Sequence, residues 1–185
     1  MNFKLLLFVI LLVCIFPIFA QDPDWYKSQI GTGYGNCGPA VVAMAIQWST
    51  GQNVTVEYIR TQIGYPISDG ATSFNMLADQ LKKYNSKVYI HTQKNLEYLV
   101  DLVSYGDVIV IVCLNTDTIS IAKPGSIFGR TYKENFGHYI ILEDVTADYF
   151  KVQDPLNNPN RFYKIDEVWA GMNKQYSTFL VVYLR

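Results

Sequence analysis

Residues 33–51 read GYGNCGPAVVAMAIQWSTG, and this stretch decides how the rest of the chain is interpreted. Cys37 follows a run of glycines at a point where a helix is expected to begin. Asn36 stands at the capping position, Pro39 is tolerated in a first turn, and Gly51 can end the helix. The residues between are apolar around most of the helix, which predicts a buried helix. Because unpaired N–H groups and the helix dipole favour an anion at a helix start, the sequence predicts that Cys37 is an acidic, nucleophilic thiol.

The first twenty residues, MNFKLLLFVILLVCIFPIFA, have the features of a secretory signal peptide. Lys4 supplies a positive charge, an unbroken apolar run follows from Leu5 to Phe16, and Ala20 is a small residue at the expected cleavage point. The apolar run is shorter than the ~18–20 residues that cross a bilayer. We therefore expect a secreted, extracytoplasmic protein with no stable membrane span after cleavage. An uncleaved anchor is the alternative, because Ile18 is bulky for its position before the cleavage point.

Residues 21–185 are long enough for one domain with its own core, and we expect a monomer. With 15 basic and 16 acidic residues in the whole chain and no basic stripe, nucleic acid is not an expected partner. Two cysteines, Cys37 and Cys113, follow the signal segment. A secreted domain held by disulfides usually has four or more in a shorter chain, so at least one cysteine is expected to have a chemical role. Cys113 lies inside an apolar strand and is interpreted as structural.

The pattern of apolar residues predicts helices in the first half of the chain and strands in the second. Helices are predicted at 37–50, 55–63, 95–105 and 166–172, and a further helix runs through residue 81 from a capping residue at 72 or 73. Strands are predicted at 87–91, 108–114, 138–145, 149–153, 161–165 and 177–184. A long loop is predicted at 115–137 and a turn at 154–160. Strand 108–114 is continuously apolar and β-branched, as in strands that are covered on both faces. This order predicts an α+β domain with helices packed on a mostly antiparallel sheet.

A thiolate needs a partner base, and the chain has only two histidines, His91 and His138. His138 begins the strand 138–145, and Asp154 ends the strand that returns beside it, so the hairpin should bring the two side chains together. In that arrangement a carboxylate holds an imidazole in the tautomer that activates a nucleophile. His91 has no cysteine motif nearby and is expected to be exposed and uninvolved. Two histidines with no adjacent acidic pair form no recognisable metal site, and no cofactor is expected.

The stretch NCGPAVVAMAI (36–46), followed later by GHYIILEDVTADYFKVQDP (137–155), resembles the papain-like cysteine peptidases of the bacteriocin-processing, double-glycine-leader type, in particular their stand-alone relatives. The resemblance implies a papain-like fold with Cys37 at the start of the central helix. It also implies that Cys37 is the nucleophile, His138 the general base and Asp154 the residue that orients it. Such enzymes usually place a Gln about six residues before the cysteine to bind the oxyanion. That position is Gly31 here, so the role is assigned to Gln29, together with the backbone N–H of Cys37.

The resemblance implies a secreted cysteine hydrolase that cleaves a peptide or related amide bond in a peptide or protein substrate through a thioester acyl-enzyme. Double-glycine specificity is not carried over, because those domains are fused to an exporter and act in the cytosol, whereas this chain is expected to be exported. One alternative keeps the triad for acyl transfer or for hydrolysis of a non-peptide amide. Another is a non-catalytic secreted binding domain in which Cys37 is silent or joined to Cys113.

Overall fold

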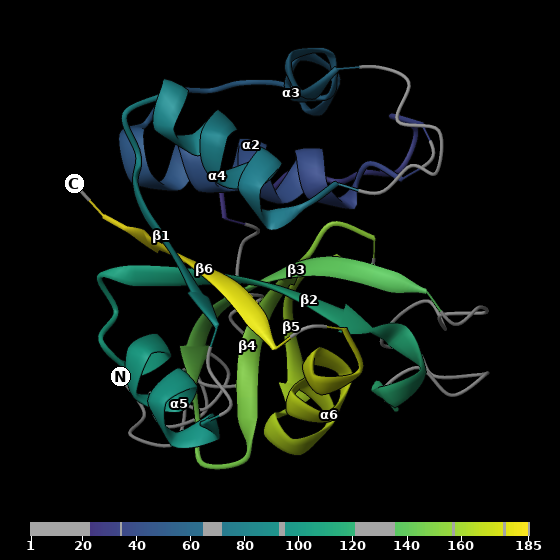
Figure 1. Ribbon diagram of the computed structural model, residues 1–185, viewed down its shortest axis with the longest axis vertical. Helices are drawn as coiled ribbons and strands as arrows, with labels where there is room; N and C mark the ends of the chain where they lie inside the picture. Colours follow the sequence, from purple (N-terminus) through teal and green to yellow (C-terminus); the bar gives the residue numbers. More distant parts are fainter. Residues whose placement is uncertain are drawn as a thin grey trace, which may run out of the picture.

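The computed structural model describes residues 23–33, 35–64, 72–92, 95–120, 136–156, 158–175 and 177–184. The predicted signal segment at 1–20 and the part of the predicted loop at 121–135 lie outside the described residues. In the described residues helices come first, and mainly strands follow (Figure 1). In chain order the elements are α2 (Cys37–Thr50), α3 (Val56–Ile63), α4 (Phe74–Lys83), β1 (Lys87–Thr92), α5 (Leu96–Ser104), β2 (Val108–Asn115), the short 3-10 helix η1 (Thr116–Thr118), β3 (Gly137–Val145), β4 (Tyr149–Asp154), β5 (Asn158–Lys164), α6 (Ile165–Gln175) and β6 (Thr178–Tyr183).

The strands form one sheet in the order β1-β6-β2-β3-β4-β5, and every neighbouring pair is antiparallel. Helices α2, α3 and α4 lie on one side of this sheet, whereas α5 and α6 lie on the other (Figure 1). The predicted α+β architecture, with helices packed on an antiparallel sheet, is confirmed. The predicted turn at 154–160 is shorter than expected, because β5 already begins at Asn158.

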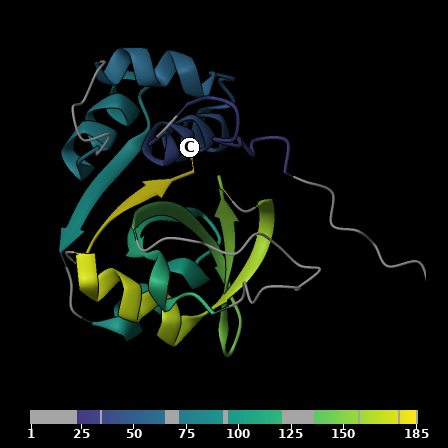
Figure 2. The same ribbon diagram turned by 90° about the vertical axis from the view of Figure 1, so that its right-hand side faces the viewer.

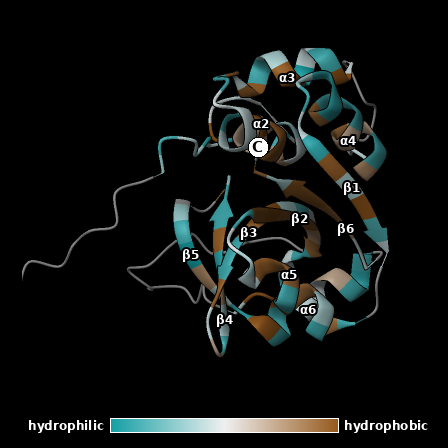
Figure 3. Ribbon diagram, turned by 90° about the vertical axis from the view of Figure 1, so that its left-hand side faces the viewer, coloured by the Kyte–Doolittle hydropathy of each residue, from teal (hydrophilic) through white to brown (hydrophobic). Residues whose placement is uncertain are grey.

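Strand β2 shows why the sheet is buried on both faces. Successive residues of a strand point to opposite faces. Ile109 and Ile111 pack in the cluster beneath α2 and α4, whereas Val108, Val110 and Val112 pack in the cluster that includes α5 and α6. In Figure 3 the hydrophobic colour of β2 accordingly lies between α2 and α5. A strand covered on both sides needs an uninterrupted apolar run, as the sequence predicted.

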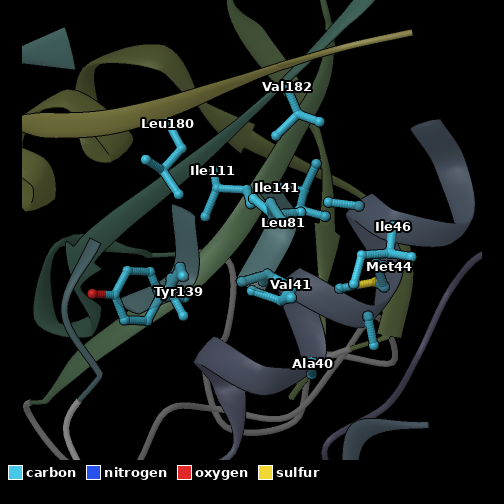
Figure 4. Close-up of a cluster of buried hydrophobic side chains, with 14 of the residues drawn as sticks. Ala40, Val41, Met44, Ile46, Leu81, Ile111, Tyr139, Ile141, Leu180 and Val182 are labelled. Atoms are coloured by element: carbon cyan, nitrogen blue, oxygen red, sulfur yellow. The ribbon is translucent and has the colours of Figure 1, made fainter. Parts of the chain in front are cut away.

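Helix α2 is anchored in the core along most of its length. Every residue from Ala40 to Ile46 is fully buried. Figure 4 shows Val41 and Met44 in one cluster with Ile111 and Ile141 of the sheet. Burial of each aliphatic side chain of this kind contributes about 1.5–3 kcal/mol. The position of the first residue of α2 is therefore fixed by the packing of the turns that follow it.

Both ends of α2 lie at the predicted residues, but the predicted side-chain cap is wrong. Gly51 ends the helix with φ 72°, and its N–H donates to the Gln47 carbonyl at 2.9 Å. Asn36 has φ −89° and ψ 14°, outside the extended region that capping residues adopt, and its side chain makes no capping bond. Its Nδ2 instead donates to the Thr32 carbonyl at 2.6 Å and so holds the preceding loop against the start of α2.

At the start of α4, Ser73 is the capping residue, since its hydroxyl accepts from the Met76 N–H.

Gly38, in the first turn of α2, allows a close approach that no other residue would permit. A Cβ atom at this position would lie 2.1 Å from Thr72 Oγ1 and 3.1 Å from Thr72 Cβ. Thr72 is itself held in place, because its carbonyl accepts a hydrogen bond from the Tyr139 hydroxyl at 2.6 Å. The beginning of α2 is thus packed directly against the segment that leads into α4.

We predict that Gly38→Ala destabilises the protein by about 1–3 kcal/mol, the usual cost of overpacking a closely packed site. Urea unfolding followed by circular dichroism measures this loss. In a Thr72→Ala background the nearest clashing atom is gone, so the same Gly38→Ala change should cost less. Equal losses in the two backgrounds would contradict this account of the contact.

Candidate active site

The predicted pairing of His138 with Asp154 is present in the structure. His138 Nε2 lies 2.8 Å from Asp154 Oδ1, and both side chains have no exposed surface. His138 follows the first residue of β3, and Asp154 is the last residue of β4. The two strands run side by side (Figure 2), with Ile141 opposite Gln153 in the register. The hairpin therefore joins the two side chains across its open end.

Asp154 is surrounded by hydrogen-bond donors. Oδ1 also accepts the Leu156 N–H at 2.9 Å, and Oδ2 accepts the Tyr163 hydroxyl at 2.5 Å. The backbone carbonyl of Asp154 accepts the Tyr26 hydroxyl at 2.8 Å. Since an unpaired carboxylate is costly to bury, these donors explain how a charged side chain can lie in the protein interior.

Cys37 and His138 form a mutually stabilised pair. Burial opposes ionisation of the Cys37 thiol, but the hydrogen bond and positive charge of His138, with the N–H groups of Tyr139 and Gly38, bring its pKa below the ordinary value. Burial likewise opposes the charged form of His138, but the charge and hydrogen bond of Asp154, aided by Cys37, raise the pKa of His138 to about 10. Both shifts favour the charged forms, a thiolate on Cys37 and an imidazolium on His138.

Cys113 lies in a different electrostatic setting. Burial, together with the nearby Cys37, raises the pKa of Cys113 to about 12, although the His138 backbone N–H partly offsets this. Cys113 lies opposite Tyr139 in the pairing of β2 with β3 and packs on the core beneath α2. Both cysteines are free thiols in the structure. Cys113 is therefore protonated at neutral pH, in keeping with the structural interpretation.

The segment that carries Gln29 runs along the turn after Asp154. The Gln29 N–H donates to the Pro155 carbonyl at 2.9 Å, and the Ser28 hydroxyl donates to the same carbonyl at 3.3 Å. Within the described residues, Gln29 Oε1 is buried without a hydrogen-bond partner. The structure thus brings the backbone of Gln29 to the edge of the Cys37–His138–Asp154 cluster. A role of its amide at the oxyanion stays a prediction.

His91 lies away from this cluster. It belongs to β1, and strands β6 and β2 separate it from β3. Its ring stacks on Phe179 with centroids 5.5 Å apart, and its Nδ1 lies 3.4 Å from the Tyr98 hydroxyl. We expected an exposed side chain, but His91 is half-buried because of this aromatic stacking.

Two residues beside the cluster, Tyr163 and Tyr26, were not predicted from the sequence. The alternation of β5 indicates a strand next to β4, but the chain has 14 tyrosines and no motif distinguishes the ones that reach Asp154. For Tyr163, the contact with Asp154 follows from the register of β4 with β5, which places Tyr163 opposite Phe150.

Two negative observations apply to the described residues. Among their helices none is long and apolar enough to cross a membrane. Their acidic, histidine and cysteine side chains form no group of three or more that could hold a metal ion.

The α+β fold, with helices packed on a six-stranded antiparallel sheet, is the papain-like fold of the C39 peptidases. The model of the Peptidase_C39 like family matches residues 16–177, and the chain belongs to this family. A search of curated proteins found no match.

The solved structures that share the fold include the following two. One is described as a C39-like peptidase from Bacillus anthracis, with a TM-score of 0.65 and 16% identity over 90% of this chain and 96% of that chain. The other is the peptidase domain of Streptococcus ComA, a bifunctional ABC transporter involved in a quorum-sensing pathway. It has a TM-score of 0.57 and 17% identity over 86% of this chain and 99% of that chain.

We predict that iodoacetamide modifies Cys37 and not Cys113 in the native protein near pH 6. The rate at Cys37 should rise with pH through its lowered pKa and then level off, because the thiolate is the reactive form. Cys113, with a pKa of about 12, should stay slow over the same range. Peptide mapping by mass spectrometry measures both rates.

The His138→Gln variant is the control for this prediction. It keeps the burial of Cys37 but removes the imidazolium, so the Cys37 pKa should move upward and labelling near pH 6 should be lost. Preferential labelling of Cys113 in the native wild-type protein would show that the assignment of the acidic thiol is wrong.

Proposed function

We propose that the protein is a secreted cysteine peptidase in which Cys37, His138 and Asp154 act as a catalytic triad. The observation that carries this proposal is the Cys37–His138 pair, whose charged state is supported by a buried hydrogen bond from His138 to Asp154 at 2.8 Å. Membership of the Peptidase_C39 like family supports peptide or protein substrates. Export rests on the signal-like residues 1–20, and a monomeric state is part of the same proposal.

In the first half of the reaction, the Cys37 thiolate attacks the carbonyl carbon of the scissile amide. The negative charge that develops on the carbonyl oxygen is stabilised by the backbone N–H of Cys37 and the side-chain amide of Gln29. His138, already an imidazolium, gives its proton to the leaving nitrogen as the C–N bond breaks. The products are a free amine and a thioester on Cys37.

In the second half, the now neutral His138 removes a proton from a water molecule that attacks the thioester carbonyl. The carbon–sulfur bond breaks, the carboxylic acid leaves, and the thiolate–imidazolium pair is restored. Asp154 keeps the imidazole in one orientation through both halves and offsets its positive charge.

The test is digestion of a defined mixture of peptides that contains all common residue pairs, with products identified by mass spectrometry. Cleavage that depends on Cys37, with an acyl group trapped on Cys37 after a rapid acid quench, is the expected result. Transfer of the acyl group to an added amine in place of water would identify an acyltransferase, and no turnover with any peptide would contradict the peptidase proposal.

We predict a graded loss of turnover across the four residues. Cys37→Ala should abolish cleavage, because the nucleophile is gone, and His138→Ala should be nearly as damaging. Asp154→Asn should leave measurable activity, since the imidazole can still reach the thiol but spends less time in the productive tautomer. Gln29→Ala should lower kcat by about 10²-fold, the usual loss for one oxyanion donor.

Steady-state kinetics on the best peptide of the mixture measures these effects, and Cys113→Ala is the matched control for loss of a thiol. It should retain cleavage, because Cys113 takes no part in the proposed steps. If Gln29→Ala keeps full activity, another group is the oxyanion donor and that single assignment is wrong.

A further inference from the structure

We propose that Tyr163 is a positioning residue, which holds the Asp154 carboxylate in the orientation that faces His138. The proposal rests on the proposed triad and adds to it a residue that neither the sequence motifs nor the family resemblance indicated. The Tyr163 hydroxyl donates to Asp154 Oδ2 at 2.5 Å, and neither side chain has exposed surface.

The ring of Tyr163 is well fixed for this task. Tyr163 lies on β5 opposite Phe150 of β4, and it is one of the largest fully buried side chains. It packs in the same cluster as Phe150, Val168 and Met172, the last two from α6. A ring enclosed by strand and helix side chains can place its hydroxyl at only one position, so the hydrogen bond to Asp154 has a defined direction.

The donors to Asp154 are divided between its two oxygens in a way that gives Tyr163 its role. Oδ1 faces His138 Nε2 and the Leu156 N–H, whereas Oδ2 faces the Tyr163 hydroxyl. Without that hydroxyl, the carboxylate can rotate about its Cβ–Cγ bond and share the remaining donors between both oxygens. The bond to His138 would then bend, and hydrogen bonds weaken steeply as they bend.

Two effects of removing the hydroxyl oppose each other. Loss of a donor leaves more negative charge on Asp154, which by itself favours the imidazolium of His138. Loss of orientation weakens the contact with His138, which disfavours the imidazolium and raises the pKa of Cys37. We expect the loss of orientation to be the larger effect, so that the pKa of Cys37 rises. In the part of the chain that the structure describes, the titratable groups that face the His138–Asp154 pair include Cys37 on α2, Cys113 on β2, Tyr163 on β5 and Tyr26 in the N-terminal segment.

The test is the kinetic pKa of Cys37, obtained from the rate of iodoacetamide alkylation as a function of pH in the full chain. Tyr163→Phe keeps the ring and removes only the hydroxyl. We expect the kinetic pKa to rise by about one unit, which makes alkylation about tenfold slower on the acid side of the profile. An unchanged or lowered kinetic pKa overturns the proposal, even if the variant is less stable to heat.

Two further variants separate positioning from a general structural effect. Tyr26→Phe also removes a tyrosine hydroxyl, but this hydroxyl donates to the main-chain carbonyl of Asp154 and not to its carboxylate. The Tyr26→Phe variant should therefore leave the kinetic pKa of Cys37 unchanged. In an Asp154→Asn background, Tyr163→Phe should produce no further rise. A rise with Tyr26→Phe, or an equal rise in the Asp154→Asn background, overturns the proposal.

The experiment needs no substrate, so its failure is distinct from failure of the proposed function. If wild-type Cys37 already titrates at the ordinary pKa of a cysteine, the proposed triad is wrong. If wild-type Cys37 is acidic and Tyr163→Phe leaves it so, only the role of Tyr163 is wrong.

Discussion

The hydrogen bond between His138 and Asp154 is the contact on which the rest of the site depends. Both side chains are fully buried, and either charge would be costly to bury alone. Together they neutralise each other, with Leu156 and Tyr163 donating further hydrogen bonds to the carboxylate. The charged imidazole then offsets the burial of Cys37 and lowers the pKa of its thiol. The proposed nucleophilicity of Cys37 therefore depends on a series of contacts that begins at Asp154.

Two parts of the fold bring Cys37 to this hairpin. Helix α2 is fixed by its buried turns and by the close contact of Gly38 with Thr72, so its first residue has a defined place above the sheet. The polar segment before α2 is fixed separately, through hydrogen bonds to the main chain of Asp154 and Pro155. The turn that follows Asp154 thus orients the carboxylate and also holds the segment that carries the candidate oxyanion donor.

Much of this arrangement could be predicted from the sequence because it depends on local patterns. The limits of α2, the two-sided burial of β2 and the meeting of His138 with Asp154 follow from apolar periodicity and from the geometry of one hairpin. The insertion of β6 between β1 and β2 could not be predicted, since it joins segments far apart in the chain. The contact of Tyr163 with Asp154 depends on the register of β4 with β5, which a bulge shifts near Asp154. The sequence also could not show that the Asn36 side chain does not cap α2, because this depends on backbone angles that residue type does not fix.

The central claim is that Cys37 is a thiolate at neutral pH because of a charged His138. Carbon-13 NMR of the cysteine Cβ atoms in uniformly Cys-labelled protein tests it most directly, since the Cβ shift reports the ionisation of each thiol without any reagent. The account predicts that at pH 7 the Cys37 resonance stands at the thiolate position and that of Cys113 at the thiol position. In the His138→Gln variant, the Cys37 resonance should move to the thiol position. If Cys37 and Cys113 of the wild-type protein are both thiols at pH 7 and titrate together near the ordinary pKa, the account is contradicted.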